Sequence, residues 1–244
     1  MDVNSPDLVP IISYPRKIND REYSDRLKEL EMIGISSILQ AGITKIGRFS
    51  ILGKGGVGLV VKVERNDRKT YALKIRRTDA NRSSMDREVR LHRIANTAGV
   101  GPSIYASTKN FILMELIDGC NIIGWLNQSL KADQVRKVVI STLEQCYNLD
   151  RAHLDHGELN CLTHHVLISE SVTPRIIDFE TASIDRKTSN VTAASHSLLL
   201  NGRISRKVGK IIGIVDRETI LELLRVYKRD QTRQTFEKII HGIT

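Results

Sequence analysis

A glycine-rich run, GKGGVGLV at residues 53–60, constrains this chain more than any other feature. It lies between short runs rich in β-branched and aromatic residues, RFSIL and LVVKVE, and TYALKI follows. This context predicts a turn that joins two strands. Dinucleotide-binding turns and Walker loops lead into a helix instead. The run therefore favours a hairpin whose backbone can close over phosphate groups, with an ordinary glycine-rich turn as the alternative.

The spacing of apolar residues divides the chain into a β-rich first half and a helical second half. Helical periodicity recurs at residues 20–33, 84–96 and 133–152 and again after Asp216, and a short hairpin, HVLI to RIIDF, interrupts the second half. We therefore expect an α+β fold of two lobes. The expected domains are an N-terminal helical extension at 1–45, a β-rich lobe at 46–117 and a small helical lobe at 118–244.

The charge balance is strongly basic, with 37 Lys and Arg against 28 Asp and Glu. Arg203, Arg206, Lys207 and Lys210 recur at helical spacing and predict one basic helix face. Such a face either contacts RNA, through release of phosphate counterions, or is simply solvated.

Targeting signals and cysteine spacing indicate where in the cell the chain resides. No apolar stretch approaches the roughly 18 residues of a membrane span, and MDVNSPDLVP lacks the order of a signal peptide. We expect a cytoplasmic chain without membrane contact. Cys120, Cys146 and Cys161 have no metal-site spacing, which favours reduced thiols over zinc or disulfides.

A lysine and a glutamate follow the glycine-rich run at informative positions. Lys74 ends the run YALK, sixteen residues after Gly58. Glu88 shares a helical stripe with Leu91 and Ala95, so it is expected to face inward. An inward carboxylate requires a cation, and Lys74 is the natural partner.

Three further segments complete an ordered set. FILMEL contains Met114 and Glu115, HGEL follows at residues 156–159, and IIDFE at 176–180. Together with the glycine-rich run and YALK, they resemble the protein-kinase-like superfamily over residues 46–228. The resemblance implies a two-lobed kinase fold that binds ATP with Mg²⁺ or Mn²⁺.

The resemblance also implies roles for particular residues. Lys74, oriented by Glu88, would hold the α- and β-phosphates, Glu158 would accept the proton of an acceptor hydroxyl, and Asp178 would hold the metal. Backbone groups of Glu115 and Ile117 would bond the adenine, and Leu167 would form its floor. The implied ATP-binding residues are Gly53, Lys54, Gly55, Gly56, Val57, Gly58, Val60, Ala72, Lys74, Met114, Glu115, Ile117 and Leu167.

Within the superfamily the chain looks most like the RIO-type atypical kinases and the kinase subunit of the KEOPS tRNA-modifying complex, in the reduced form found among archaeal serine/threonine kinases. His-Gly replaces His-Arg, nothing resembles A-P-E after Asp178, and only a short chain follows that aspartate. Without a long activation segment, the resemblance implies regulation by partners rather than by loop phosphorylation.

The chain departs from the kinase pattern at several positions. Glu158 stands where an aspartate is expected, and Thr163 stands where a metal-binding asparagine is expected. His165 or Asn160 could replace that asparagine, and histidine would favour Mn²⁺ over Mg²⁺. Glu180 replaces the glycine of D-F-G and either reaches a second metal or faces solvent.

Three functions remain open on the residues alone. The first is an ATP-dependent serine/threonine protein kinase that acts on an unidentified protein and also on itself. The second is a nucleotide-binding pseudokinase or ATPase in an RNA or ribonucleoprotein complex, which the basic charge favours. The third is a small-molecule kinase, because aminoglycoside and choline phosphotransferases carry similar H-G-D and D-[FW]-[EG] pairs.

Overall fold

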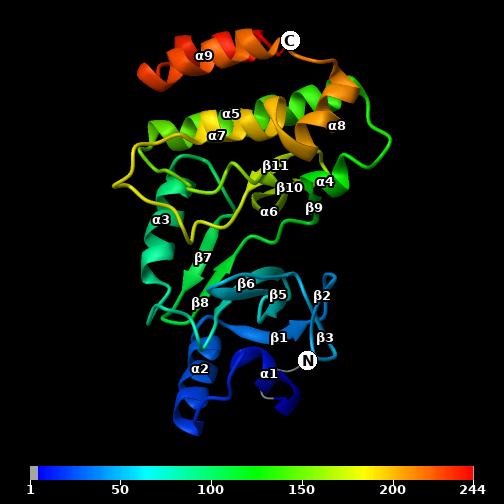
Figure 1. Ribbon diagram of the computed structural model, residues 1–244. Coiled ribbons are helices and arrows are strands. Elements are labelled where there is room, and N and C mark those ends of the chain that lie inside the picture. Colours follow the sequence, from blue (N-terminus) through cyan, green and yellow to red (C-terminus); the bar gives the residue numbers. More distant parts are fainter. Residues whose placement is uncertain (1–4, 244) are drawn as a thin grey trace. The chain divides into compact units, whose positions relative to one another are not determined.

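The β-rich runs of the first half form an antiparallel sheet in the order β1-β5-β6-β8-β7, with β4 paired to β5 (Figure 1). The computed structural model describes residues 5–243. A separate pair of short strands, β2 and β3, lies before the glycine-rich run. The strands are β1 Ile35–Leu39, β2 Thr44–Ile46, β3 Phe49–Ile51, β4 Gly53–Lys54, β5 Gly58–Arg65, β6 Thr70–Arg76, β7 Ile104–Ser107 and β8 Phe111–Met114.

Alternation along the strands sets which face of this sheet is buried. Leu59, Val61 and Val63 of β5 are buried together with Leu73 and Ile75 of β6. Because side chains alternate across a strand, these residues share one face. The helical segments η1 Pro6–Leu8, α1 Val9–Ile12 and α2 Asp20–Met32 supply apolar side chains to the same core.

The N-terminal segment differs from the expected helical extension. Helix α2 is present, and Asn19 caps it by accepting a hydrogen bond from the Glu22 N–H. Ile35–Leu39, however, forms β1 and pairs with β5. Its buried isoleucines, Ile35 and Ile38, join the core of the sheet. Burial of these β-branched residues therefore makes the segment an edge strand rather than a helix.

The chain separates into two compact units, with helix α3 Asp86–Thr97 beginning in the first and ending in the second. The first unit runs from the described N-terminus to Arg90 and includes Pro102–Leu116. The second comprises Leu91–Gly101 and the described chain from Ile117 onward. The end of α3 thus groups with the helical unit, whereas the sequence pattern assigned it to the β-rich lobe.

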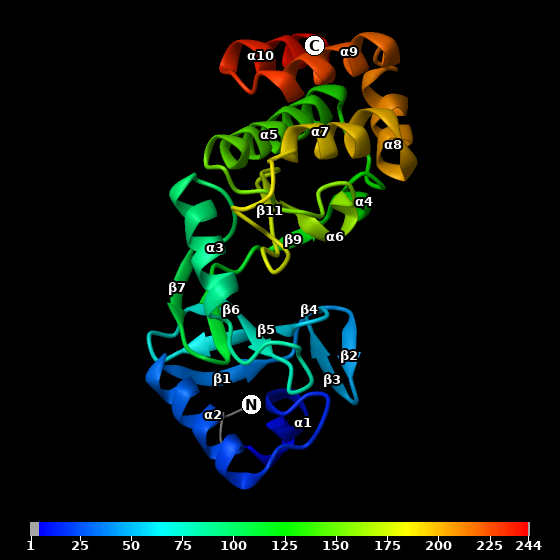
Figure 2. The same ribbon diagram turned by 60° about the vertical axis from the view of Figure 1, so that its left-hand side comes forward.

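The second unit is mainly helical and is built around the long helix α5 (Figure 2). The stripe predicted for residues 133–152 is confirmed, because Val135, Val138, Val139, Thr142 and Cys146 are all buried. Helix α5 packs against α7, α8 and β11, while α9 packs against α10. The elements are β9 Gly119–Asn121, α4 Ile122–Trp125, α5 Ala132–Arg151, α6 Leu162–His165, β10 Val166–Ser169, β11 Pro174–Ile176, α7 Asn190–Ser195, the π-helical turn η2 His196–Leu200, α8 Gly202–Ile212, α9 Arg217–Arg229 and α10 Arg233–His241.

A buried carboxylate links three of these helices. Asp150, on α5, accepts hydrogen bonds from the backbone N–H groups of Asn190 and Val191 and from the Asn190 side chain. The Tyr227 hydroxyl of α9 donates to it at 2.9 Å. Burial raises the pKa of Asp150, and these hydrogen bonds oppose the rise. The network therefore ties α7 and α9 to the end of α5.

No helix within residues 5–243 is long and apolar enough to cross a membrane.

Candidate functional site

The glycine-rich run forms the strand–turn–strand hairpin that its sequence context predicts. Strand β4 pairs with β5 through Gly53 opposite Val60 and Lys54 opposite Leu59. The turn is closed by the Gly55 N–H, which donates to the Gly58 carbonyl at 2.8 Å. Val57 is buried in a small cluster with Met85, Val89 and Ile112.

Gly58 makes room for the side chain of Lys74. A β-carbon at residue 58 would come within 3.0 Å of the Lys74 Cγ and Cε atoms and of the Ile75 carbonyl oxygen. By contrast, a β-carbon at Gly53 would meet nothing within 4 Å. Close packing therefore favours glycine at residue 58, whereas Gly53 is free of that constraint.

Arg77, which the sequence pattern did not single out, anchors the hairpin. Its backbone N–H donates to the Val57 carbonyl at 2.8 Å, and its Nη1 donates to the Gly55 carbonyl at 3.0 Å. Asp79 accepts two hydrogen bonds from the same guanidinium, and this pairing raises the pKa of Arg77. The spacing of Arg77 and Asp79 is the one sequence signal that could have pointed to this anchor.

The ion pair expected between Lys74 and Glu88 is present. Strand β6 carries Lys74 between β5 and β8, and α3 carries Glu88 in its first turn. The Lys74 Nζ lies 2.6 Å from the Glu88 Oε1, and the two side chains are 6% and 2% exposed. Both charges are buried and 2.6 Å apart, so each stabilises the other and the pair fixes the lysine firmly.

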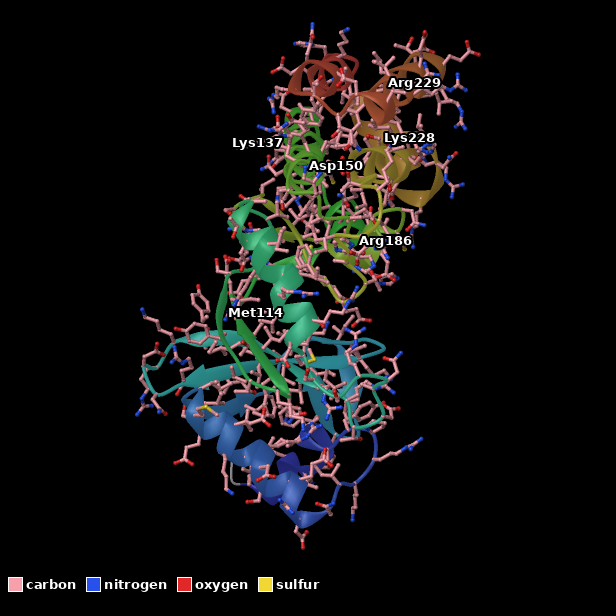
Figure 3. The ribbon with its side chains drawn as sticks, turned by 90° about the vertical axis from the view of Figure 1, so that its left-hand side faces the viewer. Met114, Lys137, Asp150, Arg186, Lys228 and Arg229 are labelled. Carbon is pink, nitrogen blue, oxygen red and sulfur yellow. The ribbon has the colours of Figure 1, made fainter. Side chains whose placement is uncertain are left out.

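Met114 and Glu115 end the sheet at the segment expected to contact an adenine. Met114 ends β8 opposite Ala72 (Figure 3). The Glu115 N–H donates to the Ser103 carbonyl at 2.9 Å, and the Ser103 N–H donates to the Glu115 carboxylate at 3.2 Å. The Glu115 N–H is therefore not available to a nucleotide, because the sheet edge already uses it.

In the second unit the segment HGEL is held by hydrogen bonds to residues 177–190. The His156 N–H donates to Asn190 Oδ1 at 2.9 Å, and the His156 carbonyl accepts from the Thr181 hydroxyl at 3.0 Å. The His156 Nε2 lies 3.1 Å from the Ile177 carbonyl, which can only accept, so Nε2 carries the proton. Burial lowers the pKa of His156 to about 4.

The surroundings of residue 157 explain why glycine follows His156 in this chain. Its φ is +90°, and a β-carbon there would lie 2.5 Å from the Arg186 Nη2 and 3.2 Å from the Thr181 carbonyl oxygen. Arg186 is held in place by Asp155 at 2.8 Å and by the Thr181 carbonyl at 2.7 Å. The positive φ and this packing both exclude an arginine at residue 157. Arg186 and Asn190 carried no signal in the sequence.

Glu158 lies beside a histidine. Its side chain is 42% exposed, and its Oε2 lies 3.6 Å from the Nε2 of His165. His165 ends α6, and its buried Nδ1 has no hydrogen-bond partner within the part of the chain that the structure describes. The neighbouring His164 is exposed, as expected of a loop residue.

Asp178 follows the hairpin of β10 and β11 in an uncommon backbone conformation. Its φ is +70°, in the left-handed region that non-glycine residues rarely adopt. Phe179, the next residue, is buried against His92 and His156, with ring centroids 4.7 and 5.2 Å away. Strained backbone of this kind concentrates at functional sites, although Arg68, His153 and Val172 share the positive φ.

The expected metal ligands are gathered only in part. No three His, Cys, Asp or Glu side chains among residues 5–243 form a group that could hold a metal. His165, Asp178 and Glu180 are therefore not gathered into one such group, and His165 lies beside Glu158. The metal roles of His165 and Glu180 and the preference for Mn²⁺ stay predictions. Mg²⁺ bound with a nucleotide takes one or two carboxylates and completes its shell with phosphates and water. A single carboxylate such as Asp178 is enough for that requirement, and its metal role stays a prediction.

Leu167 and Ile117 also belong to the second unit. Leu167 lies on β10, opposite Asn121 of β9 and Arg175 of β11, and it is half-buried. Ile117 begins the second of the two segments that form this unit. The remaining expected residues, Lys54, Gly56 and Val60, lie in the hairpin of the first unit.

Comparison with known proteins gives a relative without a described function. No protein-family model matches the chain. The chain is 30% identical over 118 residues to the uncharacterized protein MJ1211 of Methanocaldococcus jannaschii, and the match covers 48% of this chain and 99% of that protein. The chain belongs to the same family as MJ1211.

Proposed function

We propose that this protein is an ATP-dependent phosphotransferase with a protein-kinase-like fold, and that it transfers the γ-phosphoryl group to a serine or threonine hydroxyl of a protein. The observation that carries the proposal is the buried Lys74–Glu88 ion pair, whose lysine packs against Gly58 of the glycine-rich hairpin. A lysine held in this way by a helix glutamate is suited to contact the α- and β-phosphates of ATP.

The proposed reaction uses two carboxylates of the second unit. The acceptor hydroxyl oxygen forms a bond to the γ-phosphorus, the bond from that phosphorus to the β,γ-bridging oxygen breaks, and ADP leaves. Glu158 takes the proton of the hydroxyl, and its exposure supports access by an acceptor. Asp178 would hold a magnesium ion that neutralises charge on the phosphates. The left-handed backbone at Asp178 supports this assignment.

A second candidate is an ATPase or nucleotide-gated binding protein of an RNA or ribonucleoprotein complex. The basic charge of the chain favours it, because 37 Lys and Arg stand against 28 Asp and Glu. In that case water replaces the hydroxyl acceptor, and the product is free phosphate. The two candidates therefore differ in where the γ-phosphate is found.

The test follows γ-labelled ATP with the whole chain in Mg²⁺ and in Mn²⁺, and scores free phosphate and labelled protein separately. We expect label on protein, lost in Asp178→Asn and in Glu158→Gln and kept in Lys69→Ala, which removes an exposed lysine from the turn between β5 and β6. Free phosphate alone would favour the ATPase. ATP turnover that both carboxylate variants retain would refute the assigned roles.

A further inference from the structure

A groove in the second unit runs beside helix α8. Its volume is about 370 Å³, and it is bounded by the end of η2, by α8 and by residues 213–215. Aliphatic side chains form much of its lining, among them Leu198, Leu200, Ile212 and Ile214. Ile214 is 94% exposed. Exposure of so large an aliphatic side chain beside an apolar hollow marks a surface suited to binding. We call this surface the α8 groove.

The same surface is basic. Residues 202–215 contain four Lys and Arg and no Asp or Glu. Arg206 and Lys210 line the α8 groove, and Arg203 and Lys207 lie on the same helix. Within residues 5–243, these four side chains form no ion pair. Their positive charge is therefore not neutralised by the fold.

The nearest carboxylate along the chain is already engaged. Asp216 follows Val215 and caps α9 by accepting hydrogen bonds from the Thr219 N–H and hydroxyl. These hydrogen bonds lower the pKa of Asp216. The Asp216 carboxylate therefore interacts with the N-terminus of α9 and does not neutralise the cations of the α8 groove.

The lining of the groove indicates the class of partner. Single-stranded RNA is held by stacking of bases on aromatic side chains, and none of the groove residues, all of them described, is aromatic. A membrane surface would take the apolar face of a basic helix, but Ile204 and Val208 of α8 are buried in the core. An apolar hollow bordered by cations instead complements a peptide that carries both aliphatic side chains and carboxylates.

We propose that the α8 groove docks an acidic segment of a partner protein, with one or two large apolar side chains in the hollow and carboxylates paired with Arg206 and Lys210. This inference is independent of the proposed phosphotransferase activity. The apolar side chains would set the dissociation rate, and the exposed charges would raise the association rate in a salt-dependent way.

The test uses two displayed libraries of short peptides and the whole immobilised chain. One library is composed of Asp, Glu, Leu, Ile and Phe, and the matched library has Lys and Arg in place of the acids. We expect enrichment from the acidic library alone. Peptides enriched there are then labelled, and their affinity for the wild-type chain and its variants is measured by fluorescence anisotropy.

Two groove variants and one control decide the outcome. The double change Arg206→Glu/Lys210→Glu should weaken binding by about tenfold or more, because it reverses two charges at the groove. Ile214→Asp should weaken it by a similar factor, and both variants alter exposed side chains, so circular dichroism should show them folded. The control Lys228→Glu/Arg229→Glu makes the same charge change at exposed positions of α9 (Figure 3) and should leave affinity within about twofold.

Several results would overturn the proposal. These are no enrichment from the acidic library, enriched peptides that bind the groove variants as well as wild type, or equal loss in the α9 control. Displacement of the peptides by single-stranded RNA or by anionic phospholipid vesicles, with the same variant sensitivity, would assign the α8 groove to those ligands instead.

Discussion

The Nη2 of Arg186 occupies the space that a side chain at residue 157 would need, since a β-carbon built on Gly157 would lie 2.5 Å from it. The kinase pattern places arginine directly after the histidine of this loop. Here the arginine comes from a later segment, and it reaches back to Asp155 and to the Thr181 carbonyl. Arg186 therefore restrains the loop that carries Glu158 by hydrogen bonds from a later segment of the chain.

Gly157→Ala should lower the free energy of unfolding by about 1–3 kcal/mol, because it adds a strained positive φ and a steric conflict. Urea unfolding measures the change. The matched control, Gly53→Ala, adds a β-carbon that meets nothing within 4 Å and should cost less than about 0.5 kcal/mol. Equal costs for the two variants would contradict the packing described at Gly157.

Lys74→Ala should destabilise the fold as well as reduce ATP turnover. Its side chain is buried against Glu88, so it contributes to the packed interior as well as to the proposed site. Removal of this counterion from the buried glutamate should cost about 3–5 kcal/mol. The double variant Lys74→Met/Glu88→Leu removes both charges and should recover most of the stability while remaining inactive. Recovery of ATP turnover in the double variant would refute the role of Lys74.

Acidification should destabilise the protein through His156. Its pKa is lowered by burial to about 4, from an ordinary value of 6.5. Between these values the unfolded chain binds a proton that the folded protein does not, so stability is full above pH 6.5 and is lost as the pH falls towards 4. The loss from this residue should reach about 3 kcal/mol.

The histidine contribution is isolated by His156→Leu. This variant loses the hydrogen bond to the Ile177 carbonyl and should be less stable at pH 7. Its stability should then fall less between pH 7 and pH 4.5 than that of the wild type, in urea titrations at each pH. A wild-type pH profile that the variant reproduces would show that His156 is not the group responsible.

Tyr227→Phe should cost about 1.5–3 kcal/mol, because it removes a hydrogen bond to the buried Asp150 carboxylate. Thermal or urea unfolding of the whole chain is the measurement. Tyr105→Phe is the matched control, since Tyr105 is 54% exposed and should lose little when its hydroxyl is removed. Comparable losses in both variants would argue against the Asp150 network as the source of stability.

Glu158→Asp should lower phosphoryl transfer, although it restores the residue of the kinase pattern. Aspartate is one methylene shorter, so its carboxylate would lie about 1 Å further from the acceptor, and a displacement of that size can cost about a hundredfold in rate. The hydrogen-bonded backbone on either side of Gly157 restricts a movement that would compensate. The rate of label transfer is the readout, with Glu170→Asp at an exposed turn as control. Increased activity in Glu158→Asp would mean that the loop has not adapted to glutamate.

Local patterns in the sequence were enough to predict the α+β class, the hairpin at the glycine-rich run and the long helix α5. They also predicted the Lys74–Glu88 pair, because helical periodicity placed the glutamate on an apolar stripe and an inward carboxylate needs a cation. The first three inferences depend on residues close together in the chain. The fourth depends on the energetic requirement that a buried carboxylate be paired with a cation. The kinase-like function itself stays a prediction.

Contacts between distant segments were decided only by the tertiary structure. Ile35–Leu39 is a strand because it pairs with β5. Residue 157 is a glycine, unlike in the kinase pattern, because Arg186 lies where its side chain would be. The approach of His165 to Glu158 is a further contact that the spacing of these residues did not predict. Spacing in the sequence does not specify which side chains meet across a fold, since those meetings depend on packing and on the paths of loops.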